Sequence, residues 1–447
     1  MASTGLEQLR SLQNQLNTLI DDYAQAESKS PLFGLNEVGK EVSLEPQDPQ
    51  LAKLATTLNQ MQAVVLGDKL PFQRAFEFHV IGCLNVAVDA HVEEFLREAW
   101  NRGVKSLSSD ELAKPTGIDA NKLARCLRLL ASYHIFTESE TNVFSRNRCS
   151  ASLDSGVSVE ELVKDPLAKY SSERGGIGAI IGHFAQEGMR SDSYMSESLL
   201  SSTGPRDYGF SRAYDGQKIW EYFARDENES KRKRFHCGTG AMFKYLNREE
   251  SVLLGFPWAS LPEGSTICDV AGRTGNVSLE IAQAVPHLEF VVQDQESIIK
   301  AHAIPYWEAP ERQAYKERVK LVVHDFFDPQ PTKGAAVYLI RMALHGFNDD
   351  QVTQVLSNFA AAADQSSKLI IIEGVYESLA TPGVYPPSTA TPYLLDLQML
   401  SIINVRERLE AQYVSLAGRA GWKHVKTWKT GKDGQDGIFR HYEFALQ

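Results

Sequence analysis

The residues best suited to chemistry follow the apolar runs in the second half of the chain. Asp294 ends one run, Asp325 and Phe326 follow the next, and Arg341 and His345 follow the one after. We expect these runs to be strands of an open α/β sheet, whose carboxyl ends form the ligand site in folds of this class. A carboxylate there can accept from two ribose hydroxyls, and an aspartate beside a phenylalanine can bind and stack an adenine. The spacing therefore predicts a nucleoside site.

A strand, a small-residue turn and a helix precede Asp294 and complete this pattern. Thr266–Val270 is apolar, Ala271–Gly275 is rich in small residues, and Asn276 begins a helical period. Such a turn lets backbone N–H groups and a helix N-terminus approach a ligand. A G-x-G between a strand and a helix is also often only a tight turn, so the motif by itself leaves a purely structural interpretation open.

Further apolar runs alternate with helical patterns, which predicts a mostly parallel sheet covered on both faces. The predicted strands are Thr266–Val270, Phe290–Gln293, Val319–Val323, Ala336–Ile340, Lys368–Glu373, His424–Thr427 and His441–Ala445. The last runs are close together and predict an antiparallel edge. Asp349–Asp364 and Leu394–Gly418 have helical periodicity. The predicted fold class of this half is α/β.

The first half of the chain is expected to be mostly helical, with amphipathic patterns over 6–26, 50–66 and 76–100. Two short helices, capped within Ser108–Asp110 and by Asp119, then precede a hairpin, which is the order of elements in a winged helix-turn-helix. Such a module can bind DNA. The net charge of -11 and the apolar second helix favour a packing and dimer module instead.

Two features of the helical stretch 175–245 admit alternatives. Its aromatic residues, among them Tyr208, Phe210, Tyr222 and Phe223, fit either a core or the wall of an apolar pocket. Its basic run, 231–234, could serve as a localisation signal, but the acidic residues before it favour a solvated helix face.

The composition, 43% hydrophobic and 23% charged, is that of an ordinary globular protein. A length of 447 residues suggests two or three domains. The five cysteines are scattered and never in C-x-x-C spacing, so we expect free thiols in a reducing compartment and no metal site. Neither a signal peptide nor an apolar run near the roughly 18 residues of a membrane span is visible. We expect a cytoplasmic protein without a nucleic-acid or membrane partner.

Longer stretches of the chain resemble a known family. HDFFDPQP, GAAVYLIRMALHGFNDD and KLIIIEGVYE are similar to S-adenosylmethionine-dependent small-molecule O-methyltransferases of the plant caffeate and flavonoid type and their fungal relatives. The resemblance extends to ELAKPTGIDANKLARCLRLLASYHIF and DYGFSRAYDGQKIWEYF. It implies a helical and winged-helix dimerisation domain over 1–160, a helical linker over 161–260 that contributes to the substrate pocket, and a class I methyltransferase (Rossmann-like) domain over 261–447.

The resemblance also implies an S-adenosylmethionine site at the strand ends. By this resemblance, Asp269, Gly272 and Gly275 shape the methionine side of the cofactor site, and Asp294 binds the ribose. Asp325 and Phe326 bind the adenine, and Arg341 matches a basic residue near the cofactor. The family's general base corresponds to His345, and the acids that flank and orient it correspond to Glu373 and Glu407, with Arg341 counted among the catalytic candidates. Histidine can accept a phenol proton near neutrality, and a carboxylate on its other nitrogen fixes the tautomer. The family implies a homodimer and an aromatic or polyketide-derived substrate.

Three departures from the family pattern leave a second function open. Ala271 and Arg273 stand where the turn D-x-G-x-G-x-G has glycine, Gly346-Phe347 replaces Asp-Trp after the histidine, and Asn404-Val405 replaces a glycine pair. The first hypothesis is O-methylation of a phenolic or enolic secondary metabolite, with His345 as base. The alternative is a non-methylating pericyclase or dehydratase on the same scaffold, acting on a polyketide-derived pyridone.

Overall fold

The structure, a computed structural model, describes residues 4–25, 35, 49–171, 173–201, 203–204, 206–247, 252–374, 387–430 and 439–447. The chain forms two compact units. Unit 1 contains residues 1–246 with 383–389 and 401–404, and unit 2 contains 247–382, 390–400 and 405–447. The three-part division into 1–160, 161–260 and 261–447 stays a prediction.

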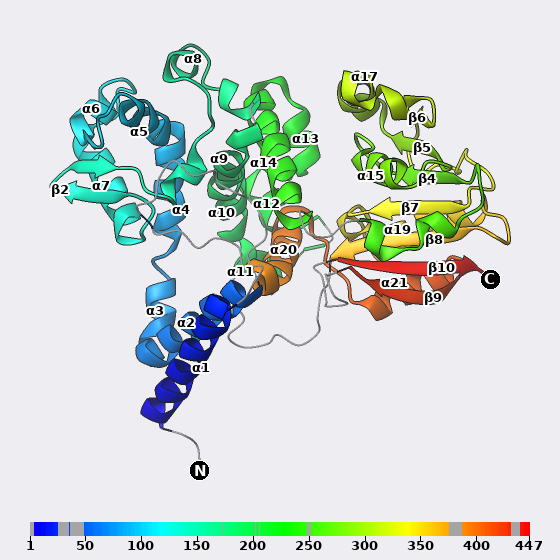
Figure 1. Ribbon diagram of the computed structural model, residues 1–447, viewed down its shortest axis with the longest axis horizontal. Coiled ribbons are helices and arrows are strands. Elements are labelled where there is room, and N and C mark those ends of the chain that lie inside the picture. Colours follow the sequence, from blue (N-terminus) through cyan, green and yellow to red (C-terminus); the bar gives the residue numbers. More distant parts are fainter. Residues whose placement is uncertain are drawn as a thin grey trace. The chain divides into compact units, whose positions relative to one another are not determined.

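Unit 2 is built on a seven-stranded sheet in the order β6-β5-β4-β7-β8-β10-β9, which Figure 1 shows with β10 in red between β8 and β9. The strands are β4 (Thr266–Val270), β5 (Glu289–Asp294), β6 (Val319–Val323), β7 (Val337–Arg341), β8 (Lys368–Gly374), β9 (Trp422–Lys429) and β10 (Phe439–Leu446). β4 to β8 pair in parallel, whereas β10 runs antiparallel to β8 and β9. The predicted strands and the antiparallel edge are confirmed.

The central strands are apolar throughout because both of their faces are buried. On one face, α19 (Asp349–Ala360) and α21 (Glu410–Arg419) pack over Ile340 and Ile371 and form the main core of the unit. α15 (Asn276–Ala284) follows β4 and packs against β4 and β5. Shorter helices connect β5 to β6: α16 (Glu296–Ile298), α17 (Ile304–Glu308) and α18 (Gln313–Lys316).

The prediction of one helix over Leu394–Gly418 is wrong. α20 (Pro387–Ile403) ends before Asn404, and α21 begins only at Glu410. Asn404 has a φ of 55°, in the left-handed region that ends helices and that asparagine tolerates better than most residues. The interruption leaves 404–409 as an irregular segment, and this segment carries Glu407.

Unit 1 is mostly helical, as predicted. Its N-terminal helices are α1 (Gly5–Gln25), α2 (Pro49–Leu66), α3 (Leu70–Arg74), α4 (Phe78–Asp89) and α5 (Val92–Asn101). Ser108 caps α6 (Ser109–Ala113) with a reciprocal capping box, and Asp119 caps α7 (Ala120–Ser132). The predicted hairpin is β2 (Thr137–Glu140) and β3 (Val143–Ser145); an unpredicted strand, β1 (Leu107–Ser108), pairs with β3. A role of this module in dimerisation stays a prediction.

The later helices of unit 1 decide the two open interpretations. They are α8 (Val159–Lys164), α9 (Gly176–His183), a π-helical turn (Phe184–Gly188), α10 (Met189–Asp192), α11 (Met195–Leu200), α12 (Gly209–Ala213), α13 (Ile219–Ala224) and α14 (Glu229–Asn247). The aromatic residues form a buried cluster, and two of its members, Tyr214 and Tyr222, also line a pocket. The solvated-face interpretation of 231–234 is wrong for Arg234, which is 4% exposed and ion-paired with Glu187 at 2.7 Å.

None of the five cysteines, all of which lie in the described ranges, forms a disulfide. Among the helices in the described ranges, none is both long and apolar enough to cross a membrane.

Candidate functional site

Asp294 lies at the carboxyl end of β5, next to the turn that follows β4. Its carboxylate accepts hydrogen bonds from the backbone N–H groups of Arg273 at 2.9 Å and Gln295 at 2.8 Å. Burial raises the pKa of this carboxyl group, and the two N–H donors oppose the shift. Because an ionised carboxylate has about four lone-pair sites, Asp294 can still accept from ligand hydroxyls.

Asp269 braces the turn from inside the protein. Its side chain is 1% exposed and accepts a hydrogen bond from Ser278 Oγ at 2.7 Å. Burial raises the pKa of Asp269 to about 6, against the lowering effects of Ser278 and Arg341. A Cβ on Gly272 would lie 2.8 Å from Asp269 Cγ, so only glycine fits above this carboxylate. Asp269 therefore shapes the turn through packing.

The turn keeps a glycine-type backbone although two of its positions carry side chains. Ala271 and Arg273 have φ values of 56° and 53°, which are left-handed. Gly275 has a φ of 80°, and a Cβ there would lie 2.8 Å from Trp307 Nε1. Glycine is thus retained where a side chain would collide, and it is replaced where only the dihedral angle is unusual.

The donors and acceptors around this turn suit a nucleoside cofactor with a carboxylate end. Helix α15, within the described unit 2, has neither a side-chain cap nor an acidic residue in its first turn, which suits a bound anion. At the end of β6, the exposed Asp325 accepts from the N–H of Phe327 at 3.0 Å. Phe326, Phe327 and Phe347 pack together, with ring centroids 4.8 to 5.4 Å apart.

Arg341 lies on the sheet face of Asp269. Asp269 pairs with Leu339, two residues before Arg341 on β7, so both side chains point to the same face of the sheet. On the next strand Arg341 pairs with Ile372. The guanidinium lies 5.3 Å from the ring of Phe439. Glu373 follows Ile372 and points to the opposite face. The structure thus groups Arg341 with the cofactor candidates and separates it from the carboxylate of Glu373.

His345 is brought together with both predicted acids. It lies in a short 3-10 turn, Leu344–Gly346, after β7. Its Nδ1 is 3.2 Å from Glu407 Oε1 and 3.4 Å from Glu373 Oε2. Glu373 comes from β8 and Glu407 from the irregular segment before α21. Both carboxylates lie at Nδ1, and neither is at the other ring nitrogen, Nε2.

The two carboxylates set the protonation of the histidine. Burial disfavours the imidazolium, but Glu373 and Glu407 together outweigh burial and raise the pKa of His345 to about 9. Burial also raises the pKa of Glu373 to about 7. His345 and Glu373 therefore titrate as a coupled pair. The ligand atoms of these two residues and Glu407 lie within 4.8 Å of one another, a spacing that would also suit a metal ion.

Two buried side chains hold the turn that carries His345. Glu373 Oε1 accepts from the backbone N–H groups of Ala343 at 3.2 Å and Leu344 at 2.8 Å. Arg408, which is 1% exposed, donates to the carbonyl oxygens of Leu344 at 3.0 Å and Phe347 at 2.6 Å. Asp349 completes the contact with an ion pair to Arg408 at 2.8 Å. These contacts fix the position of the imidazole.

Arg408 and Tyr413 were not predicted as members of this site. Tyr413 is fully buried, and its hydroxyl has no hydrogen-bond partner among the described residues. Burial, together with Glu373 and Glu407, raises its pKa well above the usual value of a tyrosine. The sequence signal for Arg408 was its place directly after Glu407. For Tyr413 the signal was its place on the inward face of α21.

Comparison with known proteins identifies the family of the chain. The O-methyltransferase domain family matches residues 195–423, about half of the chain. An O-methyltransferase of Armillaria gallica is 34% identical over 377 residues, covering 78% of this chain and 78% of that protein.

Solved structures share the fold. OxaC in complex with sinefungin and meleagrin has a TM-score of 0.73 at 17% identity, covering 98% of this chain and 99% of OxaC. A structure described as a pericyclic reaction enzyme has a TM-score of 0.70 at 16% identity, covering 99% of this chain and 100% of that protein. At such identities the likeness shows the fold alone, and it confirms the predicted Rossmann-like class. Together with the domain match and the Armillaria relative, it leads to one conclusion: the chain belongs to the family of S-adenosylmethionine-dependent small-molecule O-methyltransferases.

Proposed function

We propose that this O-methyltransferase acts on a phenolic or enolic hydroxyl of a secondary metabolite, with His345 as the general base. The observation that carries the proposal is the pair of buried carboxylates at Nδ1 of His345, at the carboxyl end of the sheet. That arrangement orients Nε2 and stabilises a positive charge on the ring, which are the two requirements of a histidine base.

The cofactor would be held by the residues around the β4–α15 turn. Asp294 would bind the ribose, Asp325 and Phe326 the adenine, and Gly272 and Gly275, braced by Asp269, would shape the methionine side with Arg341 close by. When bound, S-adenosylmethionine supplies a methyl group that its sulfonium charge activates.

The chain's own residues would align the acceptor hydroxyl and remove its proton. His345 Nε2 accepts the proton, and Glu407 and Glu373 stabilise the imidazolium that results. A positioned base contributes about 10²–10⁴-fold to the rate, and alignment of the reactants can supply about 7–11 kcal/mol. Glu373 and Arg408 contribute by holding the turn, since a base that moves by an ångström loses much of this advantage.

The test is His345→Ala, with His424→Ala on the edge strand β9 as a matched control. We expect His345→Ala to lower turnover of a methyl acceptor by at least about 10²-fold, while calorimetric binding of S-adenosylmethionine stays at the wild-type value. The control variant should keep both. Unchanged turnover in His345→Ala would reject the base assignment.

A second function is a non-methylating pericyclase or dehydratase that acts on a polyketide-derived pyridone. The replaced glycines at Ala271 and Arg273 and the Gly346-Phe347 pair support it. Mass spectrometry separates the two functions. O-methylation adds the mass of one methylene to the product, whereas ring formation leaves the mass unchanged and dehydration removes one water.

We further propose that the protein is a cytoplasmic homodimer, and that 161–260 contributes to the acceptor pocket. Support for a dimer comes from large apolar side chains exposed along the N-terminal helices, since exposed apolar surface marks interaction sites. They are Leu6, Ile20, Leu58, Val65, Phe72, Phe76 and Phe78.

A further inference from the structure

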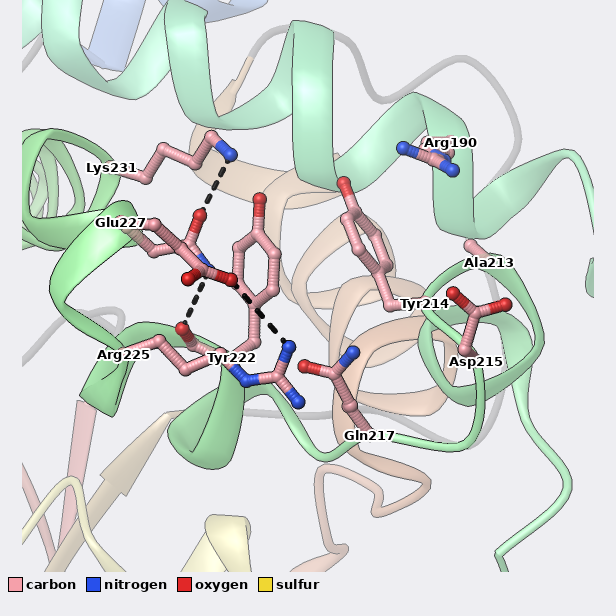
Figure 2. Close-up of a pocket in the computed structure, with 10 residues that line it drawn as sticks. Arg190, Ala213, Tyr214, Asp215, Gln217, Tyr222, Arg225, Glu227 and Lys231 are labelled. Atoms are coloured by element: carbon pink, nitrogen blue, oxygen red, sulfur yellow. Dashed lines mark hydrogen bonds and ion pairs between the residues drawn. The ribbon is translucent and has the colours of Figure 1, made fainter.

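Unit 1 contains a pocket of about 400 Å³ that the proposed chemistry at His345 does not use (Figure 2). Its lining comes from α10, the end of α12 and the loop after it, α13, the 3-10 turn Asp226–Asn228, and the start of α14. Two tyrosines, Tyr214 and Tyr222, lie side by side in the middle of Figure 2, with Lys231 toward one end of the pair and Arg190 toward the other. None of the residues of the His345 cluster is part of this lining.

The tyrosines give the pocket an aromatic floor. The ring centroids of Tyr214 and Tyr222 are 4.7 Å apart, and each residue is 8% exposed. Phe210 stacks against Tyr214 at 4.2 Å and ties this floor to the core of the unit. Burial raises the pKa of Tyr214 to about 12 and also raises that of Tyr222. Both hydroxyls therefore stay protonated at neutral pH and can donate hydrogen bonds.

The wall carries excess positive charge. The Arg190 guanidinium lies 4.6 Å from the ring of Tyr214, and Lys231 Nζ lies 5.0 Å from the ring of Tyr222. Neither cation forms an ion pair with a carboxylate in the described ranges, whereas Arg225 pairs with Glu227 at 3.7 Å. The remaining groups on the wall are thus two cations and one carboxylate, that of Asp215. This balance favours a ligand with a single negative charge.

One buried acceptor in the pocket is also unsatisfied. Gln217 Oε1 is buried, and it has no hydrogen-bond partner in the part of the chain that the structure describes. A buried polar group without a partner costs the protein stability. A hydroxyl group on a ligand would remove that cost. The acceptor therefore favours a ligand that carries a hydrogen-bond donor, in addition to the negative charge that the two cations favour.

We propose that this pocket binds a small hydroxylated aromatic carboxylate. The carboxylate is held by Arg190 and Lys231, and the ring hydroxyl donates to Gln217. The cavity is larger than an inorganic oxyanion requires, and its tyrosine floor suits one aromatic ring. The site lies wholly within unit 1 and is independent of the chemistry proposed at His345.

Calorimetric titration of the full chain, without cofactor, tests the proposal with three probes: 4-hydroxybenzoate, benzoate and inorganic phosphate. We expect saturable binding of 4-hydroxybenzoate, weaker binding of benzoate and no binding of phosphate. Arg190→Gln and Lys231→Gln should each weaken both aromatic acids about tenfold, the effect of roughly 1.4 kcal/mol. Gln217→Leu should abolish the preference for 4-hydroxybenzoate over benzoate, because only the hydroxyl reaches that side chain.

Lys233→Gln is the matched control, since Lys233 is an exposed cation on the same helix that pairs with Glu229 at 3.0 Å and does not line the pocket. It should change none of the affinities. A second control, His345→Ala, should bind both acids as the wild type does. Equal binding of phosphate, equal weakening by Lys233→Gln, or loss of binding in His345→Ala would each overturn the proposal. None of these outcomes depends on whether methyl transfer occurs.

Discussion

At the scale of single residues, the charge state of His345 decides whether the site can act as a base. Because its pKa is raised to about 9, the imidazolium dominates below that pH and cannot accept a proton. The fraction of active, neutral histidine therefore grows as the pH rises through the pKa. We expect kcat/KM for methyl transfer to increase with pH up to about 9 and to level off above it, measured at saturating cofactor. A profile that is flat between pH 6 and 9 would contradict the assignment.

Glu407 should be one source of this high pKa. Glu407→Gln removes a carboxylate that stabilises the imidazolium, so the pKa of His345 falls and the rising part of the pH profile moves to lower pH. The turnover at the plateau should also fall, because the ring is held less firmly. Glu410→Gln, at the start of α21, removes an exposed carboxylate that contacts Thr427 and should leave the midpoint in place. Identical midpoints in wild type and Glu407→Gln would show that Glu407 does not set the pKa.

The same three side chains are spaced for a metal ion, and the proposed mechanism needs none. A proton on His345 already offsets one of the two negative charges, so a divalent cation would compete with it. We expect dialysis against EDTA to leave the methyl-transfer rate within experimental error of that of the untreated enzyme, and added Zn²⁺ to inhibit. A rate that is lost with EDTA and restored by one metal would instead assign the cluster as a metal centre.

At the scale of elements, the β4–α15 turn carries a measurable strain. A left-handed conformation costs a residue with a side chain roughly 1–2 kcal/mol. Glycine avoids this cost but lowers the stability by about 0.4–1 kcal/mol, because it increases the entropy of the unfolded chain. Ala271→Gly should therefore raise the free energy of unfolding by roughly 0.5–1 kcal/mol, measured by denaturant titration. Gln283→Gly, at an exposed position inside α15, should lower it by a similar amount because helical glycine is unfavourable. If both variants changed the free energy of unfolding in the same direction, the strain at Ala271 would be contradicted.

The segment between α20 and α21 is important because Arg408 connects it to the turn of His345. Arg408→Met leaves the carbonyl groups of Leu344 and Phe347 without their donor, and it should destabilise unit 2 by about 2–4 kcal/mol. Arg406→Met is the matched control, because Arg406 contacts the same Asp349 from an exposed position. Its effect should stay below about 1 kcal/mol. Comparable losses in the two variants would show that the buried contacts of Arg408 contribute little.

Sequence patterns predicted some of these elements and missed others, and the difference has physical reasons. The central strands of unit 2 were predicted because they are buried and form continuous apolar runs. A cap within Ser108–Asp110 and a cap at Asp119 were predicted because capping needs a particular side chain. The break at Asn404 was missed because the apolar period of α20 continues into α21, and neither glycine nor proline marks the interruption. Arg408 and Tyr413 acquire their roles only through contacts with residues far away in the sequence, which no local pattern contains.

At the scale of the whole molecule, the proposed homodimer gives the last prediction. Phe72 and Phe76 are 70% and 54% exposed and pack against each other at 5.1 Å, so they present an apolar surface rather than a core. Light scattering after size exclusion should give about twice the chain mass of 49.8 kDa for the wild type. Phe72→Asp should shift the protein toward the monomer at micromolar concentration, because a charge in an apolar interface costs several kcal/mol. Leu200→Asp is the control, since Leu200 is 85% exposed on α11, outside these helices, and should leave the dimer intact. A monomeric wild type would reject the dimer, and dissociation by Leu200→Asp alone would place the interface on another surface.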